Sequence, residues 1–535
     1  MEQAIAAMRA AVRLAEQGDR IAAAAGLARA AAMAPDDPRL QVQCGGFLRQ
    51  LQHPAEALTC FDRALRILPD NPAVLGNRGI ALAELGRHAE ALTCIDTVAR
   101  LRPDDPATLV NRGSLLMQLG HPIEALADYD RAAALRPDQA PIHSNRANLL
   151  LDLRRPAEAL DAYDRALALR PDHAPTVADR GNALLALDRP SEALAAYDAA
   201  LRIDPGNAHT LDHRGKALQV LGRLDEALAS YDDAVERAPN VPAMRVHRGL
   251  CRLLLGDFAN GWRDYESRRL PPVAPWPESL AGQTVLLQAE QGLGDTVMFC
   301  RYAPLVKALG ATVLLRVPRS LVRLLATLPG VDWVVGTDEP LPVHDFACPL
   351  MSLPVRFGTV PAEVPYLTAT QAQTAIWADR LPGNGRSRVG LVWSGNADHP
   401  NDRNRSIPLS RFARLVEGDA DFVCLQNDVR PTDDPALRDI LVPEPLERDF
   451  ADTAALIASM DIVVTVDTSI AHLAGAMGKP VWILLPHDPD WRWMLGRDDS
   501  PWYPSARLFR QPVPGDWDTV LDIVAQALSR IETNR

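Results

Sequence analysis

The chain has 535 residues, of which 47% are hydrophobic and 23% are charged, values typical of a folded globular protein with several domains. A formal net charge of −12 at pH 7, without a long basic run, argues against a nucleic-acid partner. No stretch approaches the roughly 20 apolar residues of a membrane-spanning helix. The seven cysteines are scattered and never spaced as CxxC, and no signal peptide is evident, so we expect reduced thiols and a cytoplasmic protein.

The first half of the chain repeats with a period of 34 residues. A proline, a small residue, an alanine and an aromatic residue keep the same register in most units, each of which reads as two helices and a turn. This period and pattern resemble the tetratricopeptide repeat. They predict an α-solenoid over residues 1–270 with atypical end units. The recurring prolines are Pro35, Pro69, Pro103, Pro137, Pro171, Pro205 and Pro239.

A solenoid of this kind presents a concave groove that suits an extended peptide or a partner helix. Asn77, Asn111 and Asn145 occupy the same place in three successive units. An asparagine amide both donates and accepts, so this row could hold the backbone of a protein acceptor whatever its sequence. The row resembles the asparagine ladder of the eukaryotic O-linked N-acetylglucosamine transferases. The alternative is that asparagine recurs here as part of the repeat, without a ligand.

Beyond the repeats the pattern changes to that of a doubly wound α/β fold. Proline-rich residues 271–283 read as a linker, and two Rossmann-like lobes follow at 284–385 and 386–535, with a ligand expected between them. A helix is predicted from Thr296 to Leu309, and a final one at 517–530. We expect strands at 284–288, 312–316, 332–335, 345–349, 388–393, 421–425, 462–466, 481–485 and 507–509.

The first of three turns with candidate chemistry is residues 291–295, between a predicted strand and a predicted helix. Gly292 and Gly294 let the backbone approach a donor closely. Asp295 could accept a proton from an acceptor hydroxyl. The alternative for Asp295 is a structural role as the cap of the helix that follows.

The second turn follows the predicted strand that ends at residue 393. Ser394 and Gly395 are small residues at the strand end, and Arg403 and Arg405 come shortly after. The two arginines could neutralise the diphosphate leaving group of a nucleotide-sugar. A solvated arginine loop is the alternative.

The third turn lies within Asp461–Pro486, which reads as strand, loop, helix and strand. Asp467, Thr468 and Ser469 are good helix N-cap residues at the strand end. A helix N-terminus at that place offers free N–H groups and a positive dipole end to a phosphate. His472 lies on the first turn of the helix. The alternative is an ordinary βαβ unit with polar caps.

Gly294-Asp295 with Pro304, together with the run DTSIAHLAGAMGKPVW at 467–482, resembles the heptosyltransferase-type glycosyltransferases, which have the two-lobed GT-B fold. The resemblance covers roughly residues 280–530 and implies an inverting enzyme. It implies that Asp295 is the general base and that the third turn holds the nucleotide-sugar donor. Heptosyltransferases carry a lysine near the donor phosphates, where this chain offers the two arginines of the second turn.

Two DxD triplets, at 488–490 and 516–518, match the motif of metal-dependent transferases only as a short pattern. In a GT-B-type fold helix dipoles and basic side chains stabilise the leaving group, so we expect no metal and no cofactor beside the nucleotide-sugar substrate.

The sequence therefore predicts a solenoid of tetratricopeptide repeats followed by an α/β GT-B fold. We expect a glycosyltransferase that acts on a Ser or Thr hydroxyl of a protein recruited by the repeats. Repeats joined to such a transferase resemble bacterial flagellin glycosyltransferases, which makes flagellin one candidate acceptor. Two alternatives stay open: a transferase with a glycan acceptor, and a non-catalytic scaffold with degenerate transferase lobes.

Overall fold

The computed structural model describes residues 1–268, 276, 279–358, 361, 363–399, 401–426, 428–445 and 449–533. Its backbone contacts divide the chain into two compact units, Met1–Ala217 and Leu218–Arg535. Most of the linker predicted at 271–283 lies outside the described residues. Among the described residues, no helix combines the length and the apolar character needed to cross a membrane.

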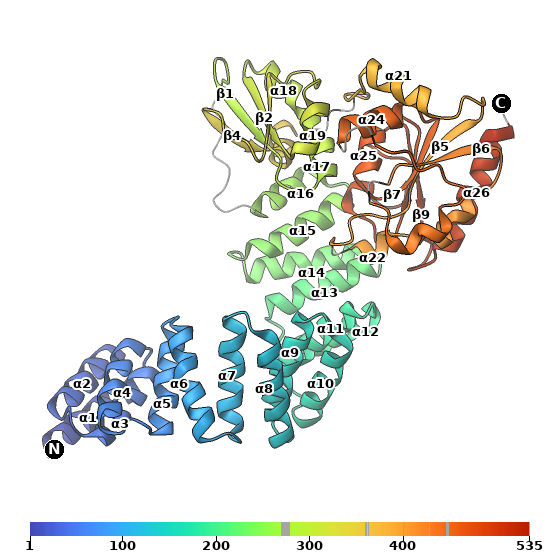
Figure 1. Ribbon diagram of the computed structural model, residues 1–535. Coiled ribbons are helices and arrows are strands. Elements are labelled where there is room, and N and C mark those ends of the chain that lie inside the picture. Colours follow the sequence, from blue (N-terminus) through green and yellow to red (C-terminus); the bar gives the residue numbers. More distant parts are fainter. Residues whose placement is uncertain are drawn as a thin grey trace. The chain divides into compact units, whose positions relative to one another are not determined.

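Successive antiparallel helix pairs make up the first unit (Figure 1). Capping side chains explain where several helices begin, because Asp37 and Asn71 accept hydrogen bonds from backbone N–H groups two and three residues further on. Proline follows each of these caps, at a place where a missing N–H costs nothing. The helices are α1 (Glu2–Glu16), α2 (Arg20–Met33), α3 (Pro38–Gln50), α4 (Pro54–Ile67), α5 (Pro72–Glu84), α6 (His88–Leu101), α7 (Pro106–Gln118), α8 (Pro122–Leu135), α9 (Ala140–Asp152), α10 (Pro156–Leu169), α11 (Ala174–Ala186), α12 (Pro190–Ile203) and α13 (Ala208–Val220).

The small residue and the aromatic residue of one unit pack directly on each other. A Cβ atom added to Gly113 would lie 2.9 Å from the Tyr129 ring, and one added to Gly181 would lie 2.6 Å from the Tyr197 ring. At these two places glycine is thus what lets the two helices of the unit approach this closely. The sequence periodicity therefore encodes a packing contact that recurs along the solenoid.

A row of ion pairs links neighbouring repeats. An arginine on the first helix of a unit contacts the aspartate 16 residues earlier, on the second helix of the preceding unit. These pairs are partly exposed, so each adds at most about 1 kcal/mol, and they mainly fix the register of the helices. The pairs, with N···O distances of 2.7, 2.5, 2.6 and 2.7 Å, are Arg78–Asp62, Arg146–Asp130, Arg180–Asp164 and Arg214–Asp198.

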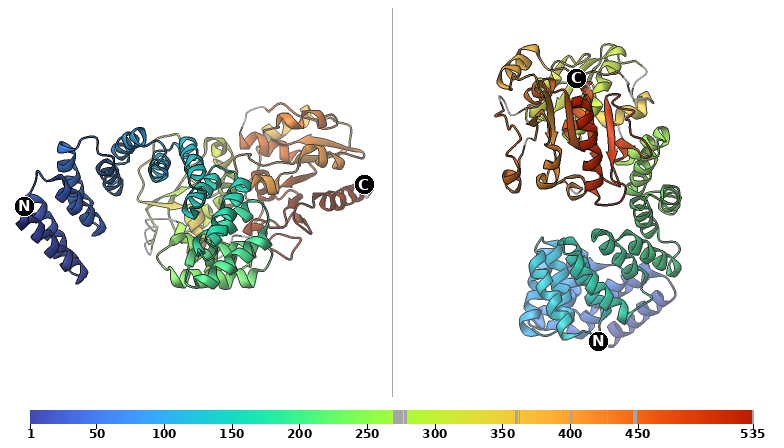
Figure 2. Two further views of the ribbon diagram at one scale, coloured as in Figure 1. Left: turned by 90° about the horizontal axis from the view of Figure 1, so that it is seen from below. Right: turned by 90° about the vertical axis from the view of Figure 1, so that its right-hand side faces the viewer.

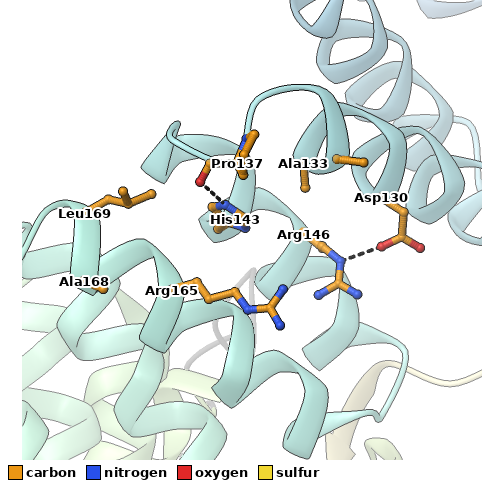
Figure 3. Close-up of a pocket in the computed structure, with 9 residues that line it drawn as sticks. Asp130, Ala133, Pro137, His143, Arg146, Arg165, Ala168 and Leu169 are labelled. Atoms are coloured by element: carbon orange, nitrogen blue, oxygen red, sulfur yellow. Dashed lines mark hydrogen bonds and ion pairs between the residues drawn. The ribbon is translucent and has the colours of Figure 1, made fainter.

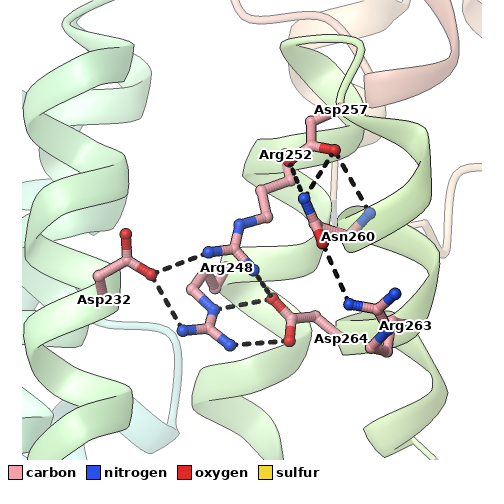
Figure 4. A network of polar contacts seen from close by, with 7 residues as sticks. All are labelled: Asp232, Arg248, Arg252, Asp257, Asn260, Arg263 and Asp264. Atoms are coloured by element: carbon pink, nitrogen blue, oxygen red, sulfur yellow. Dashed lines mark hydrogen bonds and ion pairs between the residues drawn. The ribbon is translucent and has the colours of Figure 1, made fainter.

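In the second unit, helices α14 (Leu224–Arg237), α15 (Pro242–Leu254) and α16 (Phe258–Tyr265) precede the sheets. Asp264 accepts hydrogen bonds from both Arg248 and Arg252, and the same two arginines reach Asp232 on α14 (Figure 4). The Asp264 carboxylate is only 10% exposed, so this charge depends on its two partners. The network holds the three helices together.

Trp262 on α16 belongs to the core of the α/β region. Its ring packs edge-on against Phe299 and Trp491, with centroids 5.6 and 5.0 Å away. The last repeat helices therefore share a hydrophobic core with the lobes in the second unit.

All strands of both sheets are parallel, and each predicted strand is confirmed to within one residue at either end. The first sheet has the order β3-β2-β1-β4 and the second the order β6-β5-β7-β8-β9. The strands are β1 (Thr284–Gln288), β2 (Thr312–Val317), β3 (Trp333–Gly336), β4 (Phe346–Pro349), β5 (Ser387–Val392), β6 (Ala420–Cys424), β7 (Ile462–Val466), β8 (Val481–Leu485) and β9 (Ala506–Arg510).

The second sheet is buried on both faces, as its near-continuous apolar strands require. Alternate residues of β8 point to opposite faces: Leu484 packs in one core with α26 (Trp517–Thr533), while Ile483 packs in another with α24 (Phe450–Ala458) and α25 (Ser469–Ala476). Helix α26, in red, runs alongside the strands (Figure 2). The second lobe thus has the doubly wound architecture predicted from the sequence, and the first lobe likewise has a parallel sheet.

The helix predicted from Thr296 to Leu309 is wrong in its start and in its continuity. It begins earlier, as α17 (Leu293–Phe299), and a 3₁₀ turn separates it from α18 (Ala303–Ala308). Pro304 explains the break, because proline has no N–H to donate and fits only the first turn of the new helix.

The remaining described elements are short. They are η1 (Glu266–Arg268), η2 (Cys300–Tyr302), α19 (Arg319–Leu325), η3 (Leu350–Ser352), α20 (Leu353–Phe357), α21 (Gln371–Arg380), α22 (Asp402–Arg405), α23 (Leu409–Phe412), η4 (Ala413–Leu415), η5 (Pro431–Ala436) and η6 (Trp491–Trp493).

Candidate functional site

The three turns singled out in the sequence all follow strands at topological switch points. In the first sheet the order in which strands are added reverses between β1 and β4, and in the second sheet it reverses between β5 and β7. Ligands of open α/β sheets bind outside the carboxyl ends of strands at such points. Asp295 comes after β1, Ser394 after β5, and Asp467 directly after β7.

Helix α25 begins as the cap residues predict. Thr468 is the N-cap, and its Oγ1 accepts a hydrogen bond from the Ile470 N–H at 3.3 Å. Ser469 is the first helical residue. Gly478, with φ of +68°, ends the segment in the left-handed conformation that glycine adopts readily. The N–H groups of the first turn therefore face the carboxyl end of β7.

Gly294 brings the first and third turns together. A Cβ atom at Gly294 would lie 2.7 Å from Cδ2 of His472 and 3.5 Å from Cα of Ser469, so only glycine lets α17 pack this closely on α25. Because α17 belongs to the first lobe and α25 to the second, this contact joins the two lobes at their switch points.

The His472 imidazole is buried among other side chains and is not exposed to a ligand. The residue is 5% exposed, its Nδ1 lies 3.0 Å from the Tyr503 hydroxyl, and its ring stacks on Trp493 with centroids 5.2 Å apart. Burial, followed by the nearby Arg492 and Arg301 charges, holds the pKa of His472 well below its usual value. The imidazole is therefore neutral and packs between the lobes.

Asp295 has both oxygens occupied. Its Oδ2 accepts a hydrogen bond from the Gly292 N–H at 2.9 Å, so the residue does cap the start of α17. Its Oδ1 forms an ion pair with Nη2 of Arg492, from the other lobe. The capping role considered from the sequence is thus present, and a charge contact that the sequence did not indicate is added to it.

Arg492 is the residue at this site that sequence reasoning missed. Its side chain is 10% exposed, its Nη1 lies 2.7 Å from Asp490 Oδ1, and its guanidinium lies 4.4 Å from the centre of the Trp491 ring. The Arg492 Nε is buried and has no hydrogen-bond partner among the described residues. A signal in the sequence was an arginine between two tryptophans, just beyond a predicted strand.

The second turn joins the third through Arg405. Nη1 of Arg405 donates to the Asp467 carbonyl oxygen at 3.1 Å, and a Cβ atom at Gly395 would lie 2.7 Å from the Arg405 guanidinium. Burial, followed by the charge of Asp490, raises the pKa of the Asp467 carboxyl to about 6. Arg403 is not part of this group, since its side chain is exposed on α22 and makes no ion pair with the described residues.

Ser394 adds a hydroxyl to the same place. Its backbone is fixed by Gln426, which accepts from the Ser394 N–H at 3.2 Å and donates to its carbonyl oxygen at 2.8 Å. Within the described part of the chain, Ser394 Oγ and Arg405 Nε are buried without a partner, as is the Nε of Arg492. Buried polar atoms are usually satisfied, so a polar ligand is a physical reason for three such atoms at the switch points.

The row of asparagines lies on the first helices of three repeats, in the first unit. Asn77 is on α5, Asn111 on α7 and Asn145 on α9, and each is half-buried. None of the three side-chain amides is hydrogen-bonded to another described residue. The row therefore carries amides that have donors and acceptors to offer, as a peptide-binding row requires.

Comparisons with known families find the two parts that the sequence predicted. The model described as "Tetratricopeptide repeat" matches 48–106, 77–140, 110–174, 144–208 and 214–272. The model described as "Glycosyltransferase family 9 (heptosyltransferase)" matches 447–495, which includes the third turn and Arg492. The chain thus joins tetratricopeptide repeats to a glycosyltransferase family 9 segment.

Protein FlbA of Caulobacter vibrioides is 29% identical over 326 residues, which are 52% of this chain and 53% of that protein. The chain therefore spans about half the length of this curated relative. Among solved structures, a tetratricopeptide repeat protein from Parabacteroides merdae is 19% identical; the match covers 47% of this protein and 99% of that one, with a TM-score of 0.40. YrrB, described as a TPR protein with an unusual peptide-binding site, is 20% identical; the match covers 34% of this protein and 95% of that one, with a TM-score of 0.30.

Proposed function

We propose that this chain transfers a sugar from a nucleotide-sugar donor to a protein acceptor held by the repeats. The observation that carries the proposal is the convergence of the three turns at the switch points of two parallel sheets, with the third turn inside the glycosyltransferase family 9 segment. This is the place where α/β folds of this kind bind nucleotides.

The donor diphosphate would lie against the N-terminus of α25, where free N–H groups and the helix dipole favour an anion. Arg405 and Arg492 would neutralise the charge that the diphosphate gains as it leaves. The unpartnered Ser394 hydroxyl would supply a further hydrogen bond. This set replaces the lysine of heptosyltransferases by arginines from two different loops.

Asp295 would act as the base. The Ser or Thr hydroxyl of the acceptor gives its proton to Asp295, its oxygen forms a bond to the anomeric carbon, and the bond from that carbon to the diphosphate breaks with the electrons leaving on the diphosphate. Attack opposite the leaving group inverts the anomeric centre. For Asp295 to accept the proton, Arg492 must turn from Asp295 toward the diphosphate, which offers it a stronger anionic partner.

One observation favours a second candidate, a scaffold without transferase activity. Both oxygens of Asp295 are already engaged, by the Gly292 N–H and by Arg492. In a scaffold this arrangement would be permanent, and a bound nucleotide would not be turned over. The two candidates differ in donor hydrolysis and in transfer.

The first experiment is donor binding by thermal shift, with UDP-, GDP-, ADP- and CMP-sugars, each with and without EDTA. A donor at a hundredfold excess over its Kd adds about 2.7 kcal/mol to the stability of the folded state. Arg405→Gln should weaken binding about tenfold or more, because a charge-assisted hydrogen bond contributes about 1.5–3 kcal/mol. Arg414→Gln, a surface arginine of the same lobe paired with Asp522, is the matched control and should bind as wild type.

The second experiment follows release of the nucleoside diphosphate with the donor so identified. Asp295→Asn keeps an oxygen that can accept from the Gly292 N–H but removes the charge, so we expect donor binding to remain and turnover to be lost. Wild-type turnover in Asp295→Asn would exclude the base assignment. A protein that binds no nucleotide-sugar, or binds one and never releases its sugar, would establish the scaffold instead.

The protein acceptor is tested on the full-length protein by replacing the three asparagines of the row together with alanine. We expect the KM for a protein acceptor to rise while donor hydrolysis stays at the wild-type rate. An unchanged KM would contradict the role of the row and favour a glycan acceptor.

A further inference from the structure

A hollow of about 630 Å³ opens among three helices of the repeat solenoid (Figure 3). It lies in the first unit and includes Arg146 and Asp130, one of the ion pairs that link neighbouring repeats. Both α8 and α10 contribute polar and apolar residues to its walls, and α9 contributes two polar ones. The residues that matter here are Asp130 on α8 and Pro137 just after it, His143 and Arg146 on α9, and Arg165 and Leu169 on α10.

The hollow occurs where one repeat departs from the others. His143 takes the place that apolar side chains hold in neighbouring units, among them Leu109 and Val177 at the same register. The His143 residue is 5% exposed, and its Nε2 donates to the Pro137 carbonyl oxygen at 3.0 Å. This bond holds the imidazole against the turn that follows α8, at a place where other units have an apolar contact.

Two guanidinium groups face the hollow. Arg146 donates from Nε to Asp130 Oδ1 at 2.5 Å, and no further bond of its side chain to the described residues competes for its terminal nitrogens. Arg165 is exposed and forms no ion pair with any described residue. By contrast Arg131, at the same register one unit earlier, is paired with Asp104 at 2.7 Å. Arg165 therefore differs from its counterpart in having donors available.

The net charge of the side chains around the hollow favours a ligand group with a single negative charge. Arg146 and Arg165 carry two positive charges and Asp130 carries one negative charge, so these three sum to +1 on a protein whose net charge is −12. A carboxylate matches both this charge and the planar fork of a guanidinium. A phosphate dianion would bring its second charge close to Asp130, which disfavours it.

We propose that this hollow binds a carboxylate of an extended protein segment, either an Asp or Glu side group or a free C-terminal carboxylate, with an apolar neighbour packed on Leu169. The site deepens the proposed role of the repeats in holding a protein and rests on that part of the proposed function. It takes its residues from the second helices α8 and α10 and from the first helix α9, which also carries Asn145 of the asparagine row.

The test is fluorescence anisotropy of the full-length protein with labelled nine-residue peptide pools of otherwise random neutral sequence. One pool has a central Glu and an amidated end, a second a central Gln and a free C-terminus, a third a central Gln and an amidated end, and a fourth a central phosphoserine and an amidated end. We expect the first or the second pool to bind at least tenfold more tightly than the third, and the tighter of the two identifies the source of the carboxylate.

Variants connect that binding to the hollow. Arg165→Ala should lower the affinity for the preferred pool at least tenfold. His143→Leu, which installs the residue of the preceding repeat, removes the imidazole that is bonded to the Pro137 carbonyl oxygen and should also lower the affinity for the preferred pool without lowering the melting temperature. Arg131→Ala, the same substitution one unit earlier, is the matched control and should bind as wild type.

The proposal is overturned if neutral and acidic pools bind alike, or if Arg131→Ala and Arg165→Ala lose affinity equally, which would show general electrostatic attraction. Tighter binding of the phosphoserine pool than of both carboxylate pools would exclude the carboxylate assignment. Donor binding measured on the wild-type protein separates the two proposals: if the donor binds while neither carboxylate pool binds more tightly than the neutral pool, the hollow is wrong and the transferase stands.

Discussion

Replacing Gly294 with alanine tests the contact that joins the two lobes at the candidate site. The new Cβ atom would lie 2.7 Å from His472 Cδ2, about 0.7 Å closer than the 3.4 Å at which ordinary carbon contacts begin. The ring has little room to retreat, because it is stacked on Trp493 and hydrogen-bonded to Tyr503. The overlap must therefore be relieved by moving α17 or α25.

The expected magnitude combines two opposing effects. Overpacking of this kind costs about 1–3 kcal/mol, while alanine is favoured over glycine within a helix by about 1 kcal/mol. We therefore expect Gly294→Ala to lower the free energy of unfolding by about 1 kcal/mol, the middle of the resulting range, and by no more than about 2 kcal/mol. With a urea m-value of about 3 kcal/mol per molar, the midpoint falls by roughly 0.3 M, and by no more than about 0.7 M.

Tryptophan fluorescence is the suitable assay, because all ten tryptophans lie between Trp262 and Trp517 and so report on the second unit alone. Gly292→Ala is the matched control. Gly292 has φ of −65°, which alanine adopts without strain, and a Cβ atom there would meet only Asp295 Oδ2, at 3.2 Å. Its urea midpoint should stay close to that of the wild type.

A double-mutant cycle identifies the cause of the loss. If the overlap with the imidazole destabilises the unit, Gly294→Ala should cost less in a His472→Ala background than in the wild type. Equal midpoints for Gly294→Ala and wild type would refute the reasoning, and so would an equal cost in both backgrounds. Donor binding should weaken in Gly294→Ala in proportion to the displacement of α25.

Three further substitutions have expected outcomes. Asp264→Asn should lower the free energy of unfolding of the second unit by about 2 kcal/mol, because Arg248 and Arg252 lose the more buried of their two charged acceptors. Asp518→Asn, which removes an exposed pair, should cost less than about 1 kcal/mol in the same urea titration. Arg492→Gln should weaken nucleotide-sugar binding about tenfold, measured by calorimetry, with an unchanged affinity counting against its role at the diphosphate. Because the pKa of Asp467 is raised to about 6, the wild type should lose stability relative to Asp467→Asn as the pH rises from about 4 to about 6. Above that range the difference in stability should stay constant, and urea midpoints measured across these pH values test both statements.

Much of the fold could be predicted because its signals are local. The 34-residue period records a contact that recurs once per unit, such as Gly113 on Tyr129, and the apolar runs of the strands record burial on both faces. The start of α25 could be placed because Thr468 caps it with its own side chain. The break before α18 was missed although Pro304 is visible, since a proline in a helical pattern fixes a boundary only when the backbone around it is known.

The residues that make up the candidate site were harder to predict from the sequence, because the contacts between them join residues that are far apart in the chain. Asp295 and Arg492 are separated by 197 positions, and no spacing rule relates them. His472 was expected at the donor because it lies on the first turn of α25. Which side of that turn faces the neighbouring lobe depends on packing, and the structure buries His472 there. Arg403 and Arg405 look equivalent in sequence, and only the path of α22 directs one of them to Asp467.

In the proposed transferase, the ion pair between Asp295 and Arg492 would couple donor binding to the exposure of Asp295. While the Arg492 guanidinium is paired with Asp295 and Asp490, it is not available to another anion, and Oδ1 of Asp295 is covered. A diphosphate competes with the two carboxylates for the same guanidinium, and capturing it would uncover Asp295 only when a leaving group is in place. Donor binding would then precede base activation by necessity. In that case the Arg492→Gln variant should hydrolyse the donor and transfer its sugar poorly, because it has lost a contact to the phosphates. Its Asp295 should nevertheless be free of the ion pair even when no donor is bound.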